Sequence, residues 1–248
     1  MVDTAFDDAY LASLYDRLNV DRGDEGYYLG LIAAAPRVLD VGCGTGALLH
    51  RARAAGHRGR LVGLDPSAAM LAQARRRSDI EWIQGRLTEA EFAGGFDLLV
   101  MTGHAFQELL TDEEILGFLA AAHRALDHGG HFAFETRNPL RRAWEAWTPD
   151  DVVEVEDDDG RAVRVWHDVE AVDGEHVTFT ETYASADWPA PIVTQDTLRF
   201  LTAAHLDHLL AAAGFAVDER YGDWDRSLMT PASREIITVA RCAASAAK

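Results

Sequence analysis

The sequence is short of several residue types, and each shortage excludes a class of protein. Two cysteines, Cys43 and Cys242, are too few for a disulfide-stabilised scaffold or a cysteine-based zinc site. No apolar run approaches the roughly 18 residues that a membrane-spanning helix needs. An export signal begins with basic residues, whereas residues 1–8 are acidic, so we expect a cytoplasmic protein.

Basic residues are scarce as well. The chain has 23 Lys and Arg against 41 Asp and Glu, a formal net charge of −18. Because this charge repels phosphate backbones and anionic lipids, we expect no nucleic acid and no membrane among its partners. The acidic run 154–159 is most simply a solvated loop, although it would also attract a cationic amine.

Apolar residues make up 48% of the 248 residues, enough for one large domain or a domain with an insertion. Strand-like and helix-like segments alternate, which predicts an α/β fold with a parallel sheet. The expected strands are 37–41, 60–64, 80–84, 96–101 and 131–136, separated by helices at 46–55, 67–77 and 112–126. Residues 202–213 then predict another helix, and 215–221 and 235–240 a pair of strands.

A glycine-dense turn follows the first expected strand. Gly42, Gly44 and Gly46 permit tight backbone torsions and leave no side chain to block a ligand. The next strand-like segment ends in Asp65, 19 positions after Gly46, near the roughly 20-residue spacing at which a second-strand acid reaches a ribose. The pattern predicts half of a doubly wound nucleotide-binding unit, but it also satisfies the looser dinucleotide fingerprint of dehydrogenases.

Four segments distinguish these readings: VLDVGCGTG (38–46), GLDPSAAMLAQAR (63–75), FDLLVM (96–101) and LDHGGHFAFE (126–135). In order and spacing they resemble the successive motifs of class I S-adenosylmethionine-dependent methyltransferases. The resemblance implies a doubly wound, Rossmann-like, seven-stranded α/β sheet, mostly parallel with an antiparallel C-terminal strand. It is strong over 36–136 and looser over 197–242. We therefore expect a helical cap (1–35), a methyltransferase core (36–138 and 197–248) and an inserted lid (139–196).

The resemblance also implies that S-adenosylmethionine binds at the glycine turn and leaves as S-adenosylhomocysteine. Asp40 would fix the turn and the methionine end, Asp65 would hold the ribose, and Pro66 and Met70 would pack against the adenine. Arg86 stands where many relatives have an acid, and an arginine can only donate, so the adenine amino contact is in question or falls to a backbone carbonyl. The complete expected set is Tyr15, Asp40, Gly42, Cys43, Gly44, Gly46, Asp65, Pro66, Met70, Arg86, Leu87 and Met101. For Tyr15, plain core packing is the alternative.

Residues 139–196 have a different texture from the core. Segments 163–169 and 177–183 alternate with period two around Asp173-Gly174, which predicts a β-hairpin. That turn would place Trp166 opposite Glu181 and Arg164 opposite Tyr183. We expect a small antiparallel lid sheet, joined by Trp188 and residues 152–155, that shapes the acceptor pocket. Its expected substrate-binding residues, with one from the end of the fifth strand, are Arg137, Trp166, His167 and Tyr183. The alternative is a hairpin for packing or homodimer formation.

Methyl transfer from a sulfonium is an in-line substitution, so the protein mainly aligns the reactants. A base is needed only if the acceptor arrives protonated. His104, after the fourth strand, is the leading candidate, and Glu135, at the end of the fifth, is the second catalytic candidate. The histidine pairs 128/131 and 205/208 lack a third ligand, so we expect no metal site.

The sequence thus predicts a methyltransferase that acts on a nitrogen or oxygen of a small-molecule acceptor. An NAD(P)-dependent oxidoreductase is the first alternative. Lys248 is the only lysine, so an interior tyrosine–lysine pair of the short-chain dehydrogenase type cannot form. A cofactor-binding module without catalysis is the second alternative.

Overall fold

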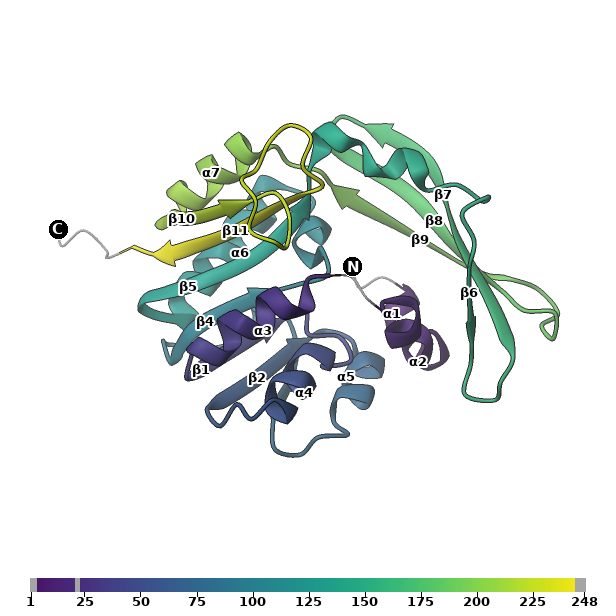
Figure 1. Ribbon diagram of the computed structural model, residues 1–248, viewed down its shortest axis with the longest axis horizontal. Helices are drawn as coiled ribbons and strands as arrows, with labels where there is room; N and C mark the ends of the chain where they lie inside the picture. The colour runs from purple at the N-terminus through teal and green to yellow at the C-terminus, as the bar shows by residue number, and fades with distance from the viewer. Residues whose placement is uncertain (1–3, 21–22, 244–248) are drawn as a thin grey trace.

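The computed structural model describes residues 4–20 and 23–243 and contains two β-sheets (Figure 1). The larger sheet has seven strands in the order β10-β11-β5-β4-β1-β2-β3. Their bounds are β1 Arg37–Val41, β2 Arg60–Asp65, β3 Glu81–Gln84, β4 Phe96–Met101, β5 Leu126–Arg137, β10 Phe215–Tyr221 and β11 Glu235–Cys242. Strands β1 to β5 run parallel, and β11 is antiparallel to both of its neighbours. The predicted fold class is therefore confirmed.

Helices cover both faces of this sheet. Helices α6 (Asp112–Ala125) and α7 (Ala203–Ala212) pack on one face, and α3 (Glu25–Ala34) and α4 (Ala47–Ala54) on the other. Helix α5 (Ala68–Ala74) follows β2. At the start of α6, Thr111 and Glu114 form a capping box, in which each side chain accepts a backbone N–H from the other residue.

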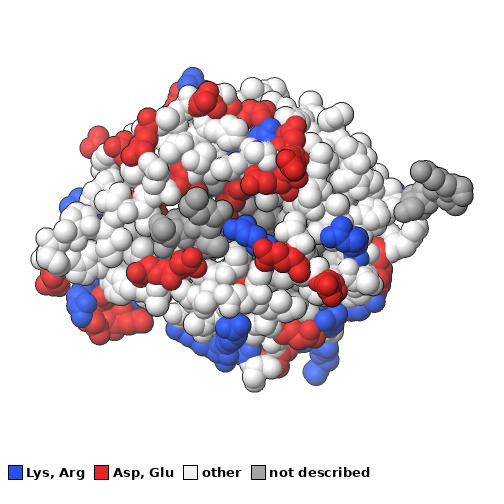
Figure 2. All heavy atoms as spheres, turned by 180° about the vertical axis from the view of Figure 1, so that it is seen from behind, with Lys and Arg blue, Asp and Glu red and all other residues white. Residues whose placement is uncertain are grey.

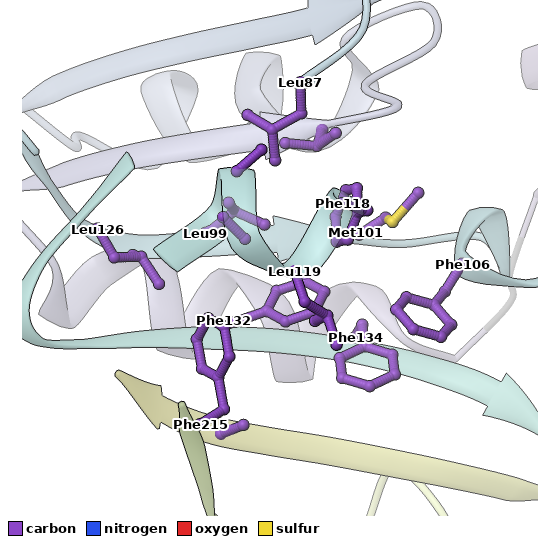
Figure 3. Packing of buried hydrophobic residues seen from close by; sticks show 14 of the residues in the cluster. Leu87, Leu99, Met101, Phe106, Phe118, Leu119, Leu126, Phe132, Phe134 and Phe215 are labelled. Carbon is purple, nitrogen blue, oxygen red and sulfur yellow. The ribbon is translucent and has the colours of Figure 1, made fainter. Parts of the chain in front are cut away.

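Strand β5 shows how alternation divides its side chains between the two faces. Phe132 and Phe134 stack 4.5 Å apart on the α6 side, where Phe106 lies 4.4 Å from Phe134 (Figure 3). Ala133 packs on the α3 side. Glu135 follows on that same side because strand side chains alternate, which carries a carboxylate into the protein toward α3.

The second sheet, called the lid sheet here, is antiparallel in the order β6-β7-β8-β9. Its strands are β6 Val153–Glu156, β7 Ala162–Asp173, β8 His176–Ala184 and β9 Ile192–Arg199, preceded by the 3₁₀ turns η2 (Pro139–Arg141) and η3 (Ala143–Ala146). Strand β9 was not expected from the sequence, and it runs past residue 196. In Figure 1 the lid sheet arches over α1 (Thr4–Asp7) and α2 (Ala9–Leu18). Leu11 and Leu14 of α2 pack against Val163, Val165 and Tyr183 of the lid sheet.

The expected hairpin register was wrong by one residue. Asp173 pairs with His176, so Gly174 and Glu175 form the turn, and an irregularity between Val169 and Ala171 shifts the pairing again. As a result Arg164 faces Ala184, Val165 faces Tyr183, Trp166 faces Thr182 and His167 faces Glu181. A bulge of this kind cannot be located from alternation alone.

The charge distribution follows the composition. On the face shown in Figure 2, acidic side chains are spread widely, whereas basic ones gather mainly along the lower edge. This surface fits the formal net charge of −18. Within the described residues, no helix is both long and apolar enough to cross a bilayer.

Candidate functional site

A cavity of about 400 Å³ opens where β1, β2 and β4 end, the edge at which open α/β sheets bind ligands. Nine of the residues expected to bind cofactor line it: Tyr15, Gly42, Gly44, Asp65, Pro66, Met70, Arg86, Leu87 and Met101. The structure thus gathers into one space residues that the sequence spreads over four strands and the N-terminal cap. We call this space the cofactor cavity, after the expectation that S-adenosylmethionine binds at the glycine turn.

Asp65 connects the two loops that form the cavity wall. Its Oδ2 accepts the backbone N–H of Gly44 at 2.8 Å, and its Oδ1 accepts that of Ser67 at 2.8 Å. The side chain is buried, and this burial raises the pKa of the carboxyl. Each carboxylate oxygen has a further lone pair, so Asp65 can also accept from two ligand hydroxyls.

The three glycines of the turn have different roles. Gly42 and Gly44 line the cavity, and a Cβ added to Gly44 would meet only the Tyr15 ring, at 4.0 Å. A Cβ on Gly46 would lie 2.4 Å from the Trp82 ring. Gly46 therefore makes room for Trp82 beneath the turn and, unlike Gly42 and Gly44, does not line the cavity.

Two other expected cofactor residues do not line the cavity. The Cys43 side chain packs with Leu71 and Trp82, and burial raises the pKa of its thiol well above the usual value. Asp40 is 1% exposed at the end of β1. Both side chains are buried in the protein and do not reach the cavity surface.

The N-terminal cap contributes to the same cavity. Tyr15 lines it, and its ring meets that of Phe6 edge-on at 5.9 Å. The neighbouring Asp16 accepts a hydrogen bond from the Thr45 hydroxyl at 2.6 Å. This bond fastens α2 to the glycine turn, a function that sequence reasoning did not assign to Asp16 or Thr45.

A second cavity, of about 180 Å³, adjoins the first and shares Phe6, Tyr15, Met70, Gly103 and Glu108 with it. We call it the acceptor cavity, after the residues expected to bind the acceptor. Three of the expected substrate residues, Arg137, His167 and Tyr183, line it. Trp166 does not: it follows Val165 and precedes His167 on β7, so its side chain lies on the opposite face of the lid sheet.

Carboxylates dominate the charged lining of the acceptor cavity. Glu108, Glu181 and Asp196 face a single arginine, Arg137, and two histidines, His104 and His167. Glu181 accepts from the Tyr183 hydroxyl at 2.6 Å and lies 3.2 Å from His167 Nε2. Burial raises the pKa of Asp196. Sequence reasoning named none of the three acids as a site residue, because their grouping depends on the lid register and on β9.

His104 is held in an unusual backbone conformation at the edge of the acceptor cavity. Its φ of 63° lies in the left-handed region, which non-glycine residues seldom occupy. The backbone N–H donates to Glu135 Oε1 at 3.0 Å, and the ring Nε2 lies 2.9 Å from Glu235 Oε2. Glu235, the first residue of β11, was not identified from the sequence.

Glu135 does not have the position expected of a catalytic residue. It is 1% exposed, its second oxygen accepts from the Tyr28 hydroxyl, and it lines neither the cofactor nor the acceptor cavity. Burial raises the pKa of this carboxyl. The structure places it behind His104, where it holds the turn rather than a ligand. Across the described part of the chain, no group of three or more His, Cys, Asp and Glu side chains is arranged to hold a metal ion.

Comparisons with known proteins agree with this geometry. Residues 38–130 match the family described as "Methyltransferase domain". The chain is 45% identical over 98 residues to 2-phytyl-1,4-naphtoquinone methyltransferase of Thermosynechococcus vestitus, covering 34% of this chain and 43% of that protein. It is 33% identical over 154 residues to aklanonic acid methyltransferase DauC of Streptomyces sp. strain C5, covering 57% and 66%. The matches thus span between about two fifths and two thirds of these curated relatives.

Solved structures share nearly the whole fold. The CcbJ methyltransferase of Streptomyces caelestis superimposes with a TM-score of 0.77 at 22% identity, covering 97% of this chain and 99% of that one. SAM-bound CalS10, an amino pentose methyltransferase of Micromonospora echinaspora, gives a TM-score of 0.69 at 24% identity, covering 95% and 97%.

The sheet order, with its cavity at the glycine turn, defines a methyltransferase fold. The chain belongs to the class I S-adenosylmethionine-dependent methyltransferases, whose cofactor is S-adenosylmethionine. The described residues fit that cofactor, because Gly44 leaves open space in the cavity and Asp65 presents carboxylate oxygens to that space.

Proposed function

We propose that this protein transfers the methyl group of S-adenosylmethionine to an amine nitrogen of a small molecule bound beneath the lid sheet. The observation that carries the proposal is the pair of adjoining cavities, one with Asp65 beside an open glycine turn and one lined by three carboxylates. Their shared wall, which includes Tyr15 and Met70, is where methyl donor and acceptor would meet.

The cofactor would be held mainly by the loops that follow β1 and β2. Asp65 would accept from ribose hydroxyls, while Pro66, Met70 and Leu87 would supply apolar contact to the adenine. When bound, the cofactor supplies an electrophilic methyl group on a sulfonium. The contribution of the protein is to place the acceptor in line with that methyl group and to exclude water from it.

The acceptor side favours a cation. Three carboxylates against one arginine give the cavity a negative potential, which attracts an ammonium group and offers it hydrogen-bond acceptors. Two structural neighbours, the amino pentose methyltransferase CalS10 and the sugar N-methyltransferase KedS8, are also named for amine acceptors. A hydroxyl acceptor is the alternative, but a neutral hydroxyl would be attracted less strongly by this negative potential.

Cofactor choice is tested by binding. We expect S-adenosylhomocysteine to raise the melting temperature in proportion to the logarithm of its concentration over Kd, and NAD to have no effect. A larger shift with NAD would favour an oxidoreductase instead. Cofactor binding without transfer to any acceptor would favour a binding module.

The acceptor atom is tested with labelled methyl groups. Isotopically labelled S-adenosylmethionine is incubated with amino sugars such as D-glucosamine, and in parallel with the matching neutral sugars. We expect label on nitrogen in the amines and none in the hydroxyl analogues, with the site of methylation read by mass spectrometry. Transfer to the neutral sugars at equal rate would contradict the nitrogen assignment while leaving methyl transfer intact.

A further inference from the structure

His104 is fixed from three sides at the wall of the acceptor cavity. Its backbone is in the left-handed region, its N–H is bound by Glu135, and its ring Nε2 meets Glu235 at 2.9 Å. The side chains of His104 and Glu235 are only 17% and 15% exposed. A surface ion pair formed by chance would have neither this burial nor the additional backbone clamp.

We infer that Glu235 is a positioning residue that keeps His104 in the tautomer protonated on Nε2, so that Nδ1 takes the proton released by the acceptor amine. This inference rests on the proposed function and adds a second residue to the site. Neither the cavity lining nor the sequence motifs point to Glu235, because it acts only through the histidine ring.

The tautomer follows from hydrogen-bonding chemistry. An ionised carboxylate can only accept, so a neutral imidazole 2.9 Å from Glu235 must present Nε2–H to it. The lone pair of the ring then lies on Nδ1, for which the described residues provide no other hydrogen bond. A carboxylate that orients a histidine in this way is a common means of preparing it as a base.

The acceptor cavity creates the need for such a base. Carboxylates hold the amine in its protonated form, and an ammonium nitrogen has no lone pair with which to attack a methyl group. When the N–H bond breaks, its electron pair stays on the acceptor nitrogen and the proton forms a bond to Nδ1. The His104–Glu235 pair then changes from one net negative charge to none, and the proton passes to solvent when product leaves.

Several other charged and titratable groups lie near His104. Glu135 and Tyr28 lie behind it, and Glu108, Glu181 and Asp196 lie in the same cavity. Arg137 and His167 also line that cavity. Glu235 is the carboxylate that contacts the ring itself.

The fold explains why Glu235 reaches this place. Strand β11 pairs antiparallel with β5 in the register Glu235 opposite Arg137 and Ile237 opposite Glu135. Cross-strand partners share a face of the sheet, and so do residues two apart on one strand, such as Arg137 and Glu135. Glu235 and Glu135 therefore lie on the same side and approach His104 together. The antiparallel terminal strand thus adds a functional carboxylate to the end of the parallel core.

Nitrogen NMR of the histidine rings tests the inference without an acceptor. In full-length protein labelled with [¹⁵N]histidine, at a pH where the ring is neutral, we expect His104 in the Nε2–H tautomer. Glu235→Gln offers both an acceptor and a donor at the same place, so it should give a mixture. Asp218→Asn, at the exposed His131–Asp218 pair 3.3 Å apart, is the matched control and should leave His104 unchanged.

Two results would overturn the inference. One is an Nδ1–H tautomer of His104 in the wild-type protein. This measurement does not depend on whether a variant folds. The other is an identical His104 spectrum in Glu235→Gln that still binds S-adenosylhomocysteine. If the wild-type protein does not bind S-adenosylhomocysteine, the proposed function fails, whereas the tautomer measurement still decides the role of Glu235.

Discussion

Asp65 Oδ2 accepts the backbone N–H of Gly44 at 2.8 Å. The two residues are 21 positions apart in the sequence, yet β1 and β2 pair in parallel with Val41 beside Leu64, so the loops that follow them meet. The same carboxylate also accepts from Ser67 at the start of α5. One side chain thus fixes both walls of the cofactor cavity and still has lone pairs for a ligand.

Replacing Asp65 by alanine should weaken binding of S-adenosylhomocysteine. The loss should be at least that of one charge-assisted hydrogen bond, about 1.5–3 kcal/mol, or more than tenfold in Kd. Isothermal titration calorimetry measures it, with Asp79→Ala as the control, because Asp79 pairs with Arg77 away from both cavities. Unchanged affinity in Asp65→Ala would show that the ribose assignment is wrong.

Two glycines of one turn should respond differently to substitution. Gly44→Val places its side chain in open cavity space, so it should abolish S-adenosylhomocysteine binding. The protein should still fold, because the strain of a valine at a φ of 53° costs only about 1–2 kcal/mol. Gly46→Ala meets Trp82 at 2.4 Å and should mainly lower the melting temperature. Calorimetry and thermal unfolding of both variants separate the effects. Normal binding by folded Gly44→Val would place the ligand elsewhere.

The sequence was sufficient to predict the sheet and the cofactor cavity because their signals are local. A strand, a glycine turn and an acid at the next strand end determine their own geometry, and most of the expected residues line one cavity. Gly46 and Cys43 do not line the cavity, because both pack against Trp82 beneath the turn. Trp82 comes from β3, and the glycine motif does not indicate which residue of that strand it will contact.

The acceptor side could be predicted only in outline, since its residues meet through long-range register. The turn at Gly174 and Glu175, together with the irregularity between Val169 and Ala171, places His167 rather than Trp166 opposite Glu181. Asp196 lies on a strand whose sequence, IVTQDTLR, is too polar to predict a strand by apolar alternation. Glu235 reaches His104 through a pairing between β5 and β11, which are separated by about a hundred residues.

Paired tyrosines on α3 provide a matched test of the buried carboxylate. Tyr28 donates its hydroxyl hydrogen to Glu135, whereas the neighbouring Tyr27 hydroxyl is buried and has no hydrogen-bond partner among residues 4–20 and 23–243. Tyr28→Phe should therefore cost about 1–3 kcal/mol of unfolding free energy, because it leaves a buried carboxylate without one of its donors. Tyr27→Phe should be neutral or slightly stabilising. Equal effects in urea denaturation would argue against a specific role for the Glu135 clamp.

The loop between β6 and β7 should make stability depend on pH. The backbone N–H of Arg161 lowers the pKa of Asp157, which also accepts from the Tyr10 hydroxyl at 2.9 Å. A carboxyl whose pKa is lower in the folded state stabilises the protein when the pH is above its unfolded-state pKa of about 3.9. This stabilisation is lost as the pH falls through the folded-state pKa.

Asp157→Ala should therefore lower the melting temperature at pH 7, and the difference from wild type should shrink in acid. Asp150→Ala, an exposed residue of the same insertion, is the control and should show no such trend. A difference that stays constant from pH 7 to acid would mean that Asp157 acts only through packing.

His104→Ala should separate turnover from cofactor affinity. His104 lines the acceptor cavity but not the cofactor cavity, so the Kd for S-adenosylhomocysteine should stay close to that of wild type. If the histidine accepts the proton of the amine, kcat should fall by about 10²–10⁴-fold. The measurements are calorimetry with S-adenosylhomocysteine and methyl transfer to an amine that the wild type accepts, with His131→Ala as a control outside the site. Equal losses of affinity and turnover would instead make His104 a binding residue, because a base that acts only on the acceptor contributes to the transition state and not to cofactor binding.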